Sequence, residues 1–154
     1  MSDDSGRFWY FAYGSNMWAD QVRRRLGCVP PSRRARLKGW RLAFNKRSTK
    51  PTDVVFANIV PDAGGEVWGA AYDMPAGLLD EMDRWEGEGY RREEATVTDD
   101  AGRTLAAVAY VARQGFILPE QPPTDAYLKR ILAGAREQEL PEEYIASILA
   151  AAAG

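Results

Sequence analysis

An aromatic run near the N-terminus constrains this fold more than any other feature of the chain. Phe8–Tyr13 reads Phe-Trp-Tyr-Phe-Ala-Tyr, which leaves no helical apolar face and predicts a buried strand. The run ends abruptly at Gly14-Ser15-Asn16, and Trp18–Leu26 then has the pattern of a short helix. The sequence therefore predicts a strand, a tight turn and a helix in direct succession.

The turn has the chemistry of an anion site. Gly14 allows a tight turn and close approach of a ligand to the backbone, and Ser15 and Asn16 are favourable N-cap residues. The N–H groups at the helix start would then face outward, with the positive end of the helix dipole behind them. Such turns are common, so spacing alone favours the other interpretation, an ordinary strand edge followed by a capped helix.

The rest of the chain predicts an α+β domain with a mostly antiparallel sheet, built from about six strands and four helices. The polar segment 45–53 is expected to be a loop, and segments 54–60 and 66–72 to form a hairpin around Pro61 and the turn 62–65. The expected strands are Arg7–Tyr13, Arg33–Phe44 with a bulge at Gly39, Val54–Val60, Glu66–Tyr72, Tyr90–Thr98 and Arg103–Ala112. The expected helices are Trp18–Leu26, one from Asp73–Pro75 to Gly87, Thr124–Gln138 and one after Pro141.

A single domain over residues 1–154 is expected, with residues 1–6 as a flexible tail and a fraying Ala-rich C-terminus. The N-terminus lacks the pattern of a signal peptide, and no apolar run is long enough to span a bilayer. One cysteine, Cys28, cannot form an intrachain disulfide, and we interpret it as a small packed residue. Together these features favour a cytoplasmic protein without a membrane partner.

The sequence contains no histidine. This excludes Ser-His-Asp and Cys-His nucleophile systems, as well as the usual histidine-containing zinc sites. Any proton transfer must therefore use a carboxylate, a tyrosine, a lysine or a water held by the backbone.

The best candidate for such a group is Glu86. An apolar helix face is expected from Leu78, Leu79, Met82 and Trp85, while Asp80, Glu81 and Asp83 should face water. Glu86 ends this helix beside the apolar face, where partial desolvation would raise the pKa of its carboxyl group and make it a better base. A surface glutamate beside a helix C-cap is the alternative.

Charge is concentrated in segment 23–50, which holds eleven Lys and Arg residues, although the whole chain has a net charge of −2. We interpret this stretch as a solvated face partly paired with acids from the C-terminal half. A binding module for an anion or a nucleic acid is the alternative.

Several motifs, in the right order, resemble the γ-glutamylcyclotransferase family. Tyr10–Met17 is similar to its signature, and Glu66–Gly69, Leu79-Asp80 and Glu86-Gly87 are similar to its later motifs. The segments around Tyr127–Ile131 and Leu140–Tyr144 also resemble the classical enzymes, so the match covers about 8–149. The gap between Glu86 and Tyr90 is shorter than in the classical enzymes, which leaves the role of Tyr90 and the leaving-group specificity open.

The resemblance implies a small β-barrel with flanking helices. It also implies conversion of γ-glutamyl amino acids to 5-oxoproline and the free amino acid, without a metal or a cofactor. Glu86 corresponds to the catalytic acid/base of the family. The implied substrate-binding residues are Tyr10, Phe11, Ala12, Tyr13, Gly14, Ser15, Asn16, Tyr90, Tyr110 and Tyr127. The implied partner is a small γ-glutamyl substrate rather than a nucleic acid or a membrane, and a homodimer is left open.

The residue chemistry agrees with this expectation, because a γ-glutamyl substrate carries its own nucleophile. Glu86 would take a proton from the α-ammonium group, and the amine would attack the γ-carbonyl carbon. N–H groups of the turn would stabilise the carbonyl oxygen or bind the α-carboxylate. Two alternatives stay open: a γ-glutamylamine cyclotransferase with a simple or ε-lysyl leaving amine, and a non-catalytic binding module.

Overall fold

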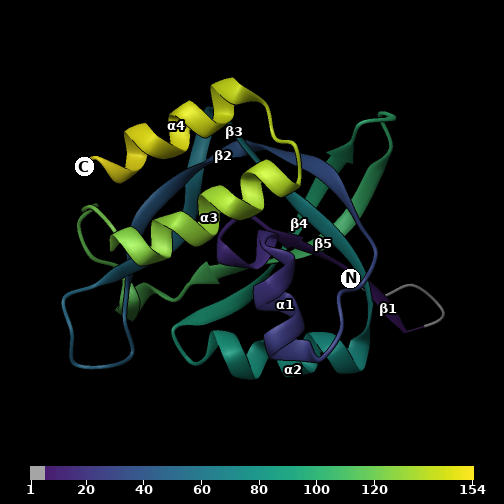
Figure 1. The fold of residues 1–154 in the computed structure, drawn as a ribbon, viewed down its shortest axis with the longest axis horizontal. Helices are drawn as coiled ribbons and strands as arrows, with labels where there is room; N and C mark the ends of the chain where they lie inside the picture. Colours follow the sequence, from purple (N-terminus) through teal and green to yellow (C-terminus); the bar gives the residue numbers. More distant parts are fainter. Residues whose placement is uncertain (1–5) are drawn as a thin grey trace.

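The computed structural model describes residues 6–154, in which five strands close into a barrel flanked by four α-helices (Figure 1). The strand order is β1-β3-β2-β4-β5, and the barrel closes where β1 pairs in parallel with β5. All other strand pairs are antiparallel. The strands are β1 (Arg7–Ala12), β2 (Ser32–Arg47), β3 (Val55–Pro75), β4 (Tyr90–Asp99) and β5 (Thr104–Ala112), the helices are α1 (Ala19–Leu26), α2 (Ala76–Glu86), α3 (Asp125–Glu137) and α4 (Glu142–Ala152), and η1 (Ser15–Met17) and η2 (Gln114–Phe116) are short 3-10 turns.

The structure confirms the predicted α+β class and the mostly antiparallel barrel. Of the expected tail 1–6, residues 1–5 lie outside the described residues. Gly6 is held in place, because its carbonyl oxygen accepts a hydrogen bond of 2.9 Å from the Ala76 N–H.

The hairpin predicted over 54–72 is wrong, because β3 is one continuous strand. Both of its halves pair antiparallel with the same neighbour, β2, on either side of a bulge. Trp40 pairs with Pro61 and Lys38 with Glu66, so that residues 62–65 of β3 oppose only Gly39 of β2. Gly39 has a φ of +89°, a conformation that glycine adopts readily. The extra residues bend the strand without reversing it.

The polar loop predicted at 45–53 is also partly wrong, because β2 continues to Arg47. A second register shift lies between Phe44 and Lys46. The shift breaks the alternation of inward and outward side chains, so that residues 43–46 are all buried. Lys46 is only 3% exposed as a result.

Helix α2 buries Leu79 and Met82 as predicted, but Trp85 is 51% exposed. Its indole N–H donates a 2.8 Å hydrogen bond to the carbonyl oxygen of Arg25 at the end of α1. The guanidinium of Arg25 lies 5.7 Å from the ring centroid. Trp85 therefore covers the C-terminal end of α1 instead of entering the core.

Two other sequence predictions fail at the surface. Cys28 is exposed rather than packed, since it follows the left-handed C-cap residue Gly27 after α1. The Ala-rich C-terminus does not fray, because α4 continues to Ala152, whose exposed fraction is 7%.

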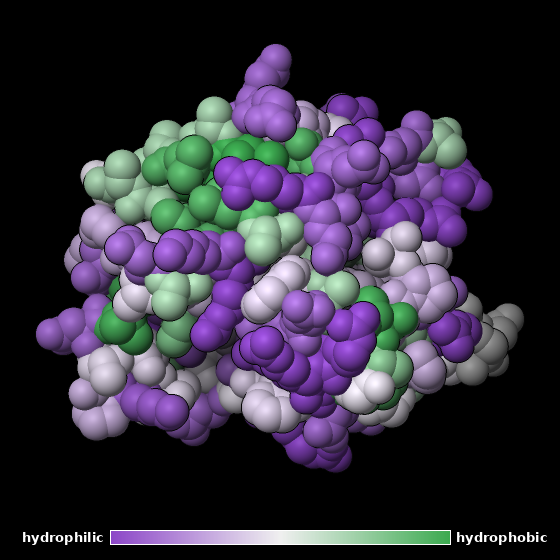
Figure 2. All heavy atoms as spheres, viewed as in Figure 1, coloured by the Kyte–Doolittle hydropathy of each residue, from purple (hydrophilic) through white to green (hydrophobic). Residues whose placement is uncertain are grey.

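In Figure 2 the hydrophobic residues on the visible face gather over α4 and neighbouring α3, whereas most of the rest of that face is polar. Among residues 6–154, no helix is both long and apolar enough to cross a membrane. The basic segment 23–50 is partly paired, as expected, because six of its eleven cations form ion pairs within residues 6–154. Its ion pairs with acids further along the chain include Arg33–Asp99 (3.0 Å), Arg34–Asp100 (3.1 Å), Arg36–Glu66 (3.6 Å) and Arg41–Glu120 (2.9 Å).

Helix α3 fixes the turn that follows β1. Thr124 caps the helix as predicted, its side chain accepting a hydrogen bond from the Tyr127 N–H. Gly134 lies directly on the backbone of η1: a Cβ atom there would approach the Trp18 nitrogen to 2.6 Å and the Met17 carbonyl carbon to 2.7 Å. Only a residue without a side chain allows this contact.

This contact predicts that Gly134→Ala destabilises the protein. The added methyl group would clash with the backbone of η1, which can move aside only at a cost in packing. We therefore expect a loss of about 1–3 kcal/mol in the free energy of unfolding, measured by urea titration. Gly77→Ala is the matched control, since nothing lies within 4 Å of a Cβ atom at that helical position. The control should be neutral or stabilising by up to ~1 kcal/mol. Equal effects of the two substitutions would contradict the proposed close contact.

Candidate active site

The first helix does not begin on the Gly-Ser-Asn turn. The N-cap of α1 is Trp18, without a side-chain capping bond, and the N–H of Ala19 donates to the Glu137 carboxylate at 2.8 Å. The predicted N-cap role of Ser15 and Asn16, with the dipole of α1 behind them, is therefore wrong. The sequence did not reveal that a carboxylate from α3 would satisfy the helix start.

The turn instead closes on itself as η1. Met17 N–H donates to the Gly14 carbonyl oxygen at 3.1 Å, and Trp18 N–H donates to the Ser15 carbonyl oxygen at 3.2 Å. Within residues 6–154, the N–H groups of Ser15 and Asn16 have no protein acceptor. A Cβ atom at Gly14 would lie 3.5 Å from the Tyr127 hydroxyl, so glycine keeps this side of the turn open.

The side chain of Asn16 connects the turn to its surroundings. It is 3% exposed, and its Nδ2 donates to the Tyr10 hydroxyl at 2.9 Å and to Glu86 Oε1 at 3.1 Å. Its Oδ1 accepts from Gln21 Nε2 at 3.0 Å and from Arg25 Nη1 at 3.2 Å. Asn16 is thus a buried hydrogen-bonding centre that joins β1, α1 and α2.

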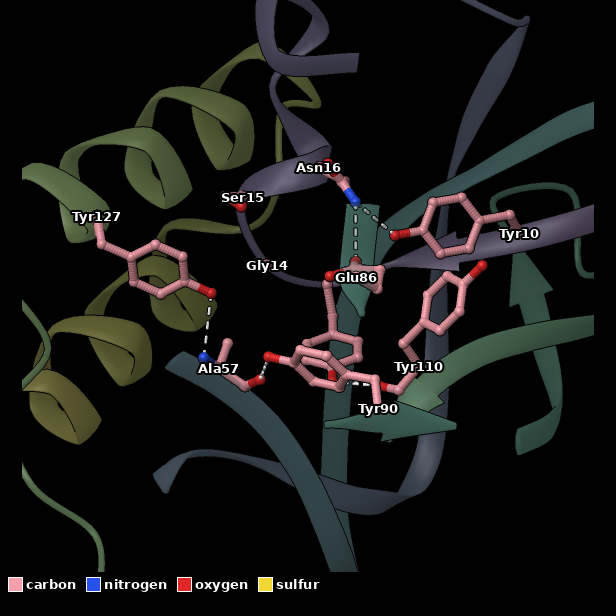
Figure 3. A pocket seen from close by; sticks show the side chains of 10 residues that line it. Tyr10, Gly14, Ser15, Asn16, Ala57, Glu86, Tyr90, Tyr110 and Tyr127 are labelled. Atoms are coloured by element: carbon pink, nitrogen blue, oxygen red, sulfur yellow. Dashed lines mark hydrogen bonds between the residues drawn. The ribbon is translucent and has the colours of Figure 1, made fainter. Parts of the chain in front are cut away.

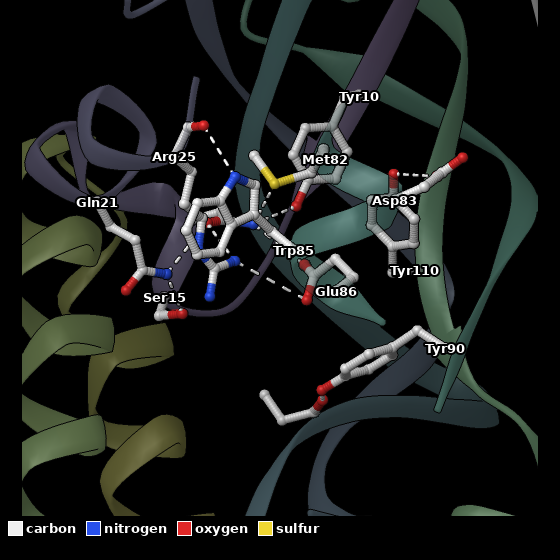
Figure 4. Close-up of polar contacts among 12 residues, drawn as sticks. Tyr10, Ser15, Gln21, Arg25, Met82, Asp83, Trp85, Glu86, Tyr90 and Tyr110 are labelled. Carbon is white, nitrogen blue, oxygen red and sulfur yellow. Dashed lines mark hydrogen bonds and ion pairs between the residues drawn. The ribbon is translucent and has the colours of Figure 1, made fainter. Parts of the chain in front are cut away.

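Glu86 is the last residue of α2, and Gly87 (φ 78°) ends the helix immediately after it. The Glu86 side chain is 17% exposed, and its Oε2 lies 4.0 Å from Arg25 Nη1 (Figure 4). Burial is the largest influence on this group and raises the pKa of the Glu86 carboxyl, while the Arg25 and Lys46 cations and the Tyr10 hydroxyl partly oppose it. A carboxyl group with a raised pKa suits both proton uptake and proton return near neutral pH.

Asp83, one turn earlier, lies in a different environment. It was expected to face water, but its carboxylate accepts hydrogen bonds from the Tyr110 hydroxyl at 2.5 Å and from Arg92 at 2.8 and 3.0 Å. Although burial acts in the opposite direction, these bonds lower the pKa of Asp83. The two carboxyl groups of α2 are therefore tuned in opposite directions.

Three tyrosine hydroxyls are committed to protein acceptors. Tyr13 donates to the Tyr110 carbonyl oxygen at 2.5 Å, and Tyr90 donates to the Ala57 carbonyl oxygen at 2.7 Å. Tyr110 donates to Asp83. Since a hydroxyl has one hydrogen, these side chains form walls rather than donors for a ligand.

Tyr10 and Tyr127 differ from these three. Their oxygens accept, from Asn16 Nδ2 and from the Ala57 N–H at 3.1 Å. The Tyr10 hydroxyl hydrogen goes to the Glu86 carboxylate, whereas the Tyr127 hydroxyl keeps its hydrogen for another acceptor. Burial raises the pKa of Tyr10 and of Tyr127, which keeps both protonated at neutral pH.

Glu86 and the turn face one narrow inner pocket of about 30 Å³. Figure 3 shows Glu86 at its centre, with Asn16, Tyr90 and Tyr127 around it. The pocket is lined by Tyr10, Tyr13, Gly14, Ser15, Asn16, Ala57, Glu86, Tyr90, Tyr110 and Tyr127. The structure thus brings together all the predicted site residues except Phe11 and Ala12, which are 0% and 2% exposed and belong to the core.

The inner pocket adjoins a wider outer pocket of about 330 Å³, with which it shares Ser15, Glu86, Tyr90 and Tyr127. Sequence reasoning indicated only these four shared residues of the outer pocket and missed the others, among them the cations Arg25 and Lys46. The sequence predicts a loop at Lys46, because the bulge that turns this side chain inward leaves no signal in the neighbouring residues. Within residues 6–154, no group of three His, Cys, Asp or Glu side chains is placed to hold a metal ion.

Comparisons with known proteins agree with this architecture. A family model described as the AIG2-like family matches residues 66–148. A γ-glutamylcyclotransferase from Bos taurus is 32% identical over 149 residues, covering 93% of this chain and 78% of that protein, and one from Homo sapiens is 31% identical over 147 residues, covering 92% and 77%. A solved structure named γ-glutamyl cyclotransferase superposes with a TM-score of 0.84 at 31% identity, covering 94% of this chain and 87% of that one.

The buried carboxyl group predicts a pH-dependent stability effect. Because the pKa of Glu86 is raised on folding, its contribution favours the folded state at low pH and is lost as pH rises through the folded pKa. Glu86→Gln removes the buried charge, so the variant should unfold at higher urea concentration than the wild type at pH 8. The difference should shrink as pH falls toward the ordinary glutamate pKa of about 4.3.

Glu81→Gln, which alters a partly exposed carboxylate on the same helix, is the control and should not reproduce this pattern. A Glu86→Gln protein that is less stable than the wild type by the same margin at every pH would refute the burial argument.

Proposed function

This chain belongs to the AIG2-like family and is an enzyme of the γ-glutamylcyclotransferase class, and from this premise we propose that it converts γ-glutamyl amino acids to 5-oxoproline and a free amino acid. One observation carries the proposal: the Glu86 carboxyl group is held by Asn16 of the turn inside a tyrosine-lined pocket. A proton-transfer group and a set of free backbone donors thus face the same small volume.

Glu86 acts first as a general base. The α-amine of the substrate is protonated at neutral pH and cannot attack until it loses a proton. The Glu86 carboxyl group has a raised pKa, and Glu86 lines both the inner and the outer pocket. It takes the proton, and the free amine attacks the γ-carbonyl carbon to close the five-membered ring.

The turn stabilises the charge that develops on the γ-carbonyl oxygen. The N–H groups of Ser15 and Asn16 are without acceptors in the described chain, and Ser15 and Asn16 line the inner pocket. One well-placed donor to such an oxyanion is worth about 2.7–4 kcal/mol of transition-state stabilisation. The donors come from backbone that α3 holds in place, so they need little reorganisation during the reaction.

The tyrosines hold the flexible glutamyl chain in its folded, reactive shape. Fixing that geometry is a large contribution to catalysis, because ring closure requires the amine and the carbonyl to meet. Tyr13, Tyr90 and Tyr110 supply rigid walls, and the Tyr10 hydroxyl is bonded to Glu86. The hydroxyl of Tyr127 keeps its hydrogen for a polar group of the substrate.

Glu86 then acts as a general acid. Collapse of the tetrahedral intermediate breaks the amide C–N bond, and the protonated Glu86 carboxyl returns its proton to the departing nitrogen. The leaving amine exits into the outer pocket, which Glu86 also lines. After the attack the ring nitrogen still carries one extra proton, which passes through the regenerated Glu86 carboxylate to the departing amine, so that the amine leaves as an ammonium group and the ring ends as the lactam. The cycle then balances without any further reactant.

This mechanism predicts that Glu86→Gln lowers 5-oxoproline release from γ-glutamyl-alanine by about 10²–10⁴-fold, the usual range for loss of a general acid–base. The amide can still accept the Asn16 hydrogen bond, so the fold should survive, as judged by circular dichroism. Glu81→Gln, on the partly exposed side of α2, should retain wild-type turnover. Undiminished turnover in Glu86→Gln would remove this residue from the mechanism.

The pKa of Glu86 predicts the acidic limb of the pH profile. Since the base must be ionised, kcat/KM should fall as pH drops through the raised pKa of Glu86. The limb should therefore lie above the ordinary glutamate value of about 4.3. A flat profile from pH 4 to 8 would be incompatible with a buried carboxyl base.

A further inference from the structure

Lys46 is the most unusual charged residue near the site. It is 3% exposed, and lysine is rarely so buried unless it is paired. None of the ion pairs among residues 6–154 includes it. Burial lowers the pKa of its ammonium group, and the nearby carboxylates Glu86 and Glu88 oppose this effect only in part.

The position of the ammonium group is nevertheless well defined. Its nitrogen lies 4.7 Å from the ring centroid of Tyr90 and 5.6 Å from those of Phe56 and Phe116. These rings stabilise a cation by their faces while leaving its N–H groups unused. Gly89 lies against the end of the side chain, since a Cβ atom there would come within 2.6 Å of the nitrogen.

The ammonium group faces the outer pocket, beyond Glu86. The outer pocket is lined by four cationic residues, Arg25, Lys46, Lys50 and Arg130, and by one acid, Glu86. Lys46 lines this outer pocket but not the inner one that contains the turn. The charge balance of the leaving-group side therefore favours an anion.

We infer that Lys46 is a specificity-determining residue that binds the carboxylate of the leaving amino acid. The inference rests on the proposed function, since it assigns a residue to the part of the substrate that departs. The α-carboxylate of the leaving amino acid is one carbon from the scissile nitrogen, next to Glu86. It would supply the anion that the buried ammonium group lacks. Simple γ-glutamylamines, which lack this carboxylate, would leave Lys46 unpaired.

The test compares two substrates of the same size. γ-Glutamyl-alanine carries the carboxylate, whereas γ-glutamyl-alaninamide replaces it with a neutral amide. The wild-type enzyme should prefer the acid by about 10–100-fold in kcat/KM, as expected for a charge-assisted hydrogen bond. Lys46→Met should reduce this preference to about threefold or less. Any effect of the lost cation on Glu86 acts on both substrates and cancels in the ratio.

Two further variants separate the position of the Lys46 ammonium group from the general effect of a positive charge. Gly89→Ala keeps the lysine but pushes aside its flexible end, so it should also reduce the preference for the acid. Lys38→Met removes one exposed cation from the same strand outside the pockets and should keep the wild-type preference. Circular dichroism checks that each variant is folded.

Each result decides the inference. A wild-type enzyme without preference, or a Lys46→Met variant that slows both substrates by the same factor, would overturn it, because Lys46 would then act on the glutamyl part or only on Glu86. Both results leave the proposed function intact, since 5-oxoproline is still released. Absence of 5-oxoproline from every γ-glutamyl substrate would instead overturn the proposed function and this inference with it.

Discussion

The rest of the site depends on the hydrogen bond from Asn16 Nδ2 to Glu86, 3.1 Å long. A carboxylate that loses water is costly unless polar neighbours compensate it. Asn16 provides a neutral donor, which stabilises the carboxyl group without forcing it to stay ionised. Gln21 and Arg25 donate to the side-chain oxygen of Asn16, and the backbone carbonyl oxygen of Asn16 accepts from the Tyr72 hydroxyl at 2.7 Å. The acid and the backbone donors are thereby fixed relative to each other.

The opposite pKa shifts of Asp83 and Glu86 also follow from the polar groups that surround each carboxyl group. Both belong to α2 and both have a tyrosine hydroxyl beside them, but Asp83 receives two bonds from Arg92, whereas Glu86 has an amide at 3.1 Å and a guanidinium only at 4.0 Å. The stronger partners keep Asp83 ionised, and the weaker ones leave Glu86 able to exchange a proton. The function of each carboxyl group is therefore set by what surrounds it, not by its residue type.

Local sequence predicted the fold where local forces decide it. The aromatic run predicted β1, the segments 90–98 and 103–112 predicted β4 and β5, and Thr124 predicted the start of α3. Local sequence did not predict the structure where a distant segment determines it. β2 pairs with both halves of β3, and Glu137 accepts the hydrogen bond at the start of α1. A bulge between β2 and β3 turns Lys46 inward. Family resemblance indicated Glu86 and the tyrosines, but the role of Asn16 as a hydrogen-bonding centre appears only in three dimensions.

The central claim is that Glu86 and the η1 turn act on one substrate molecule from two sides. The most direct measurement is a crystal structure of the Glu86→Gln variant with γ-glutamyl-alanine bound. We expect the α-amine about 2.7–3.2 Å from the side chain at position 86 and the γ-carbonyl oxygen facing the N–H groups of Ser15 and Asn16. A substrate bound elsewhere, or with its α-amine turned away from position 86, would contradict the account.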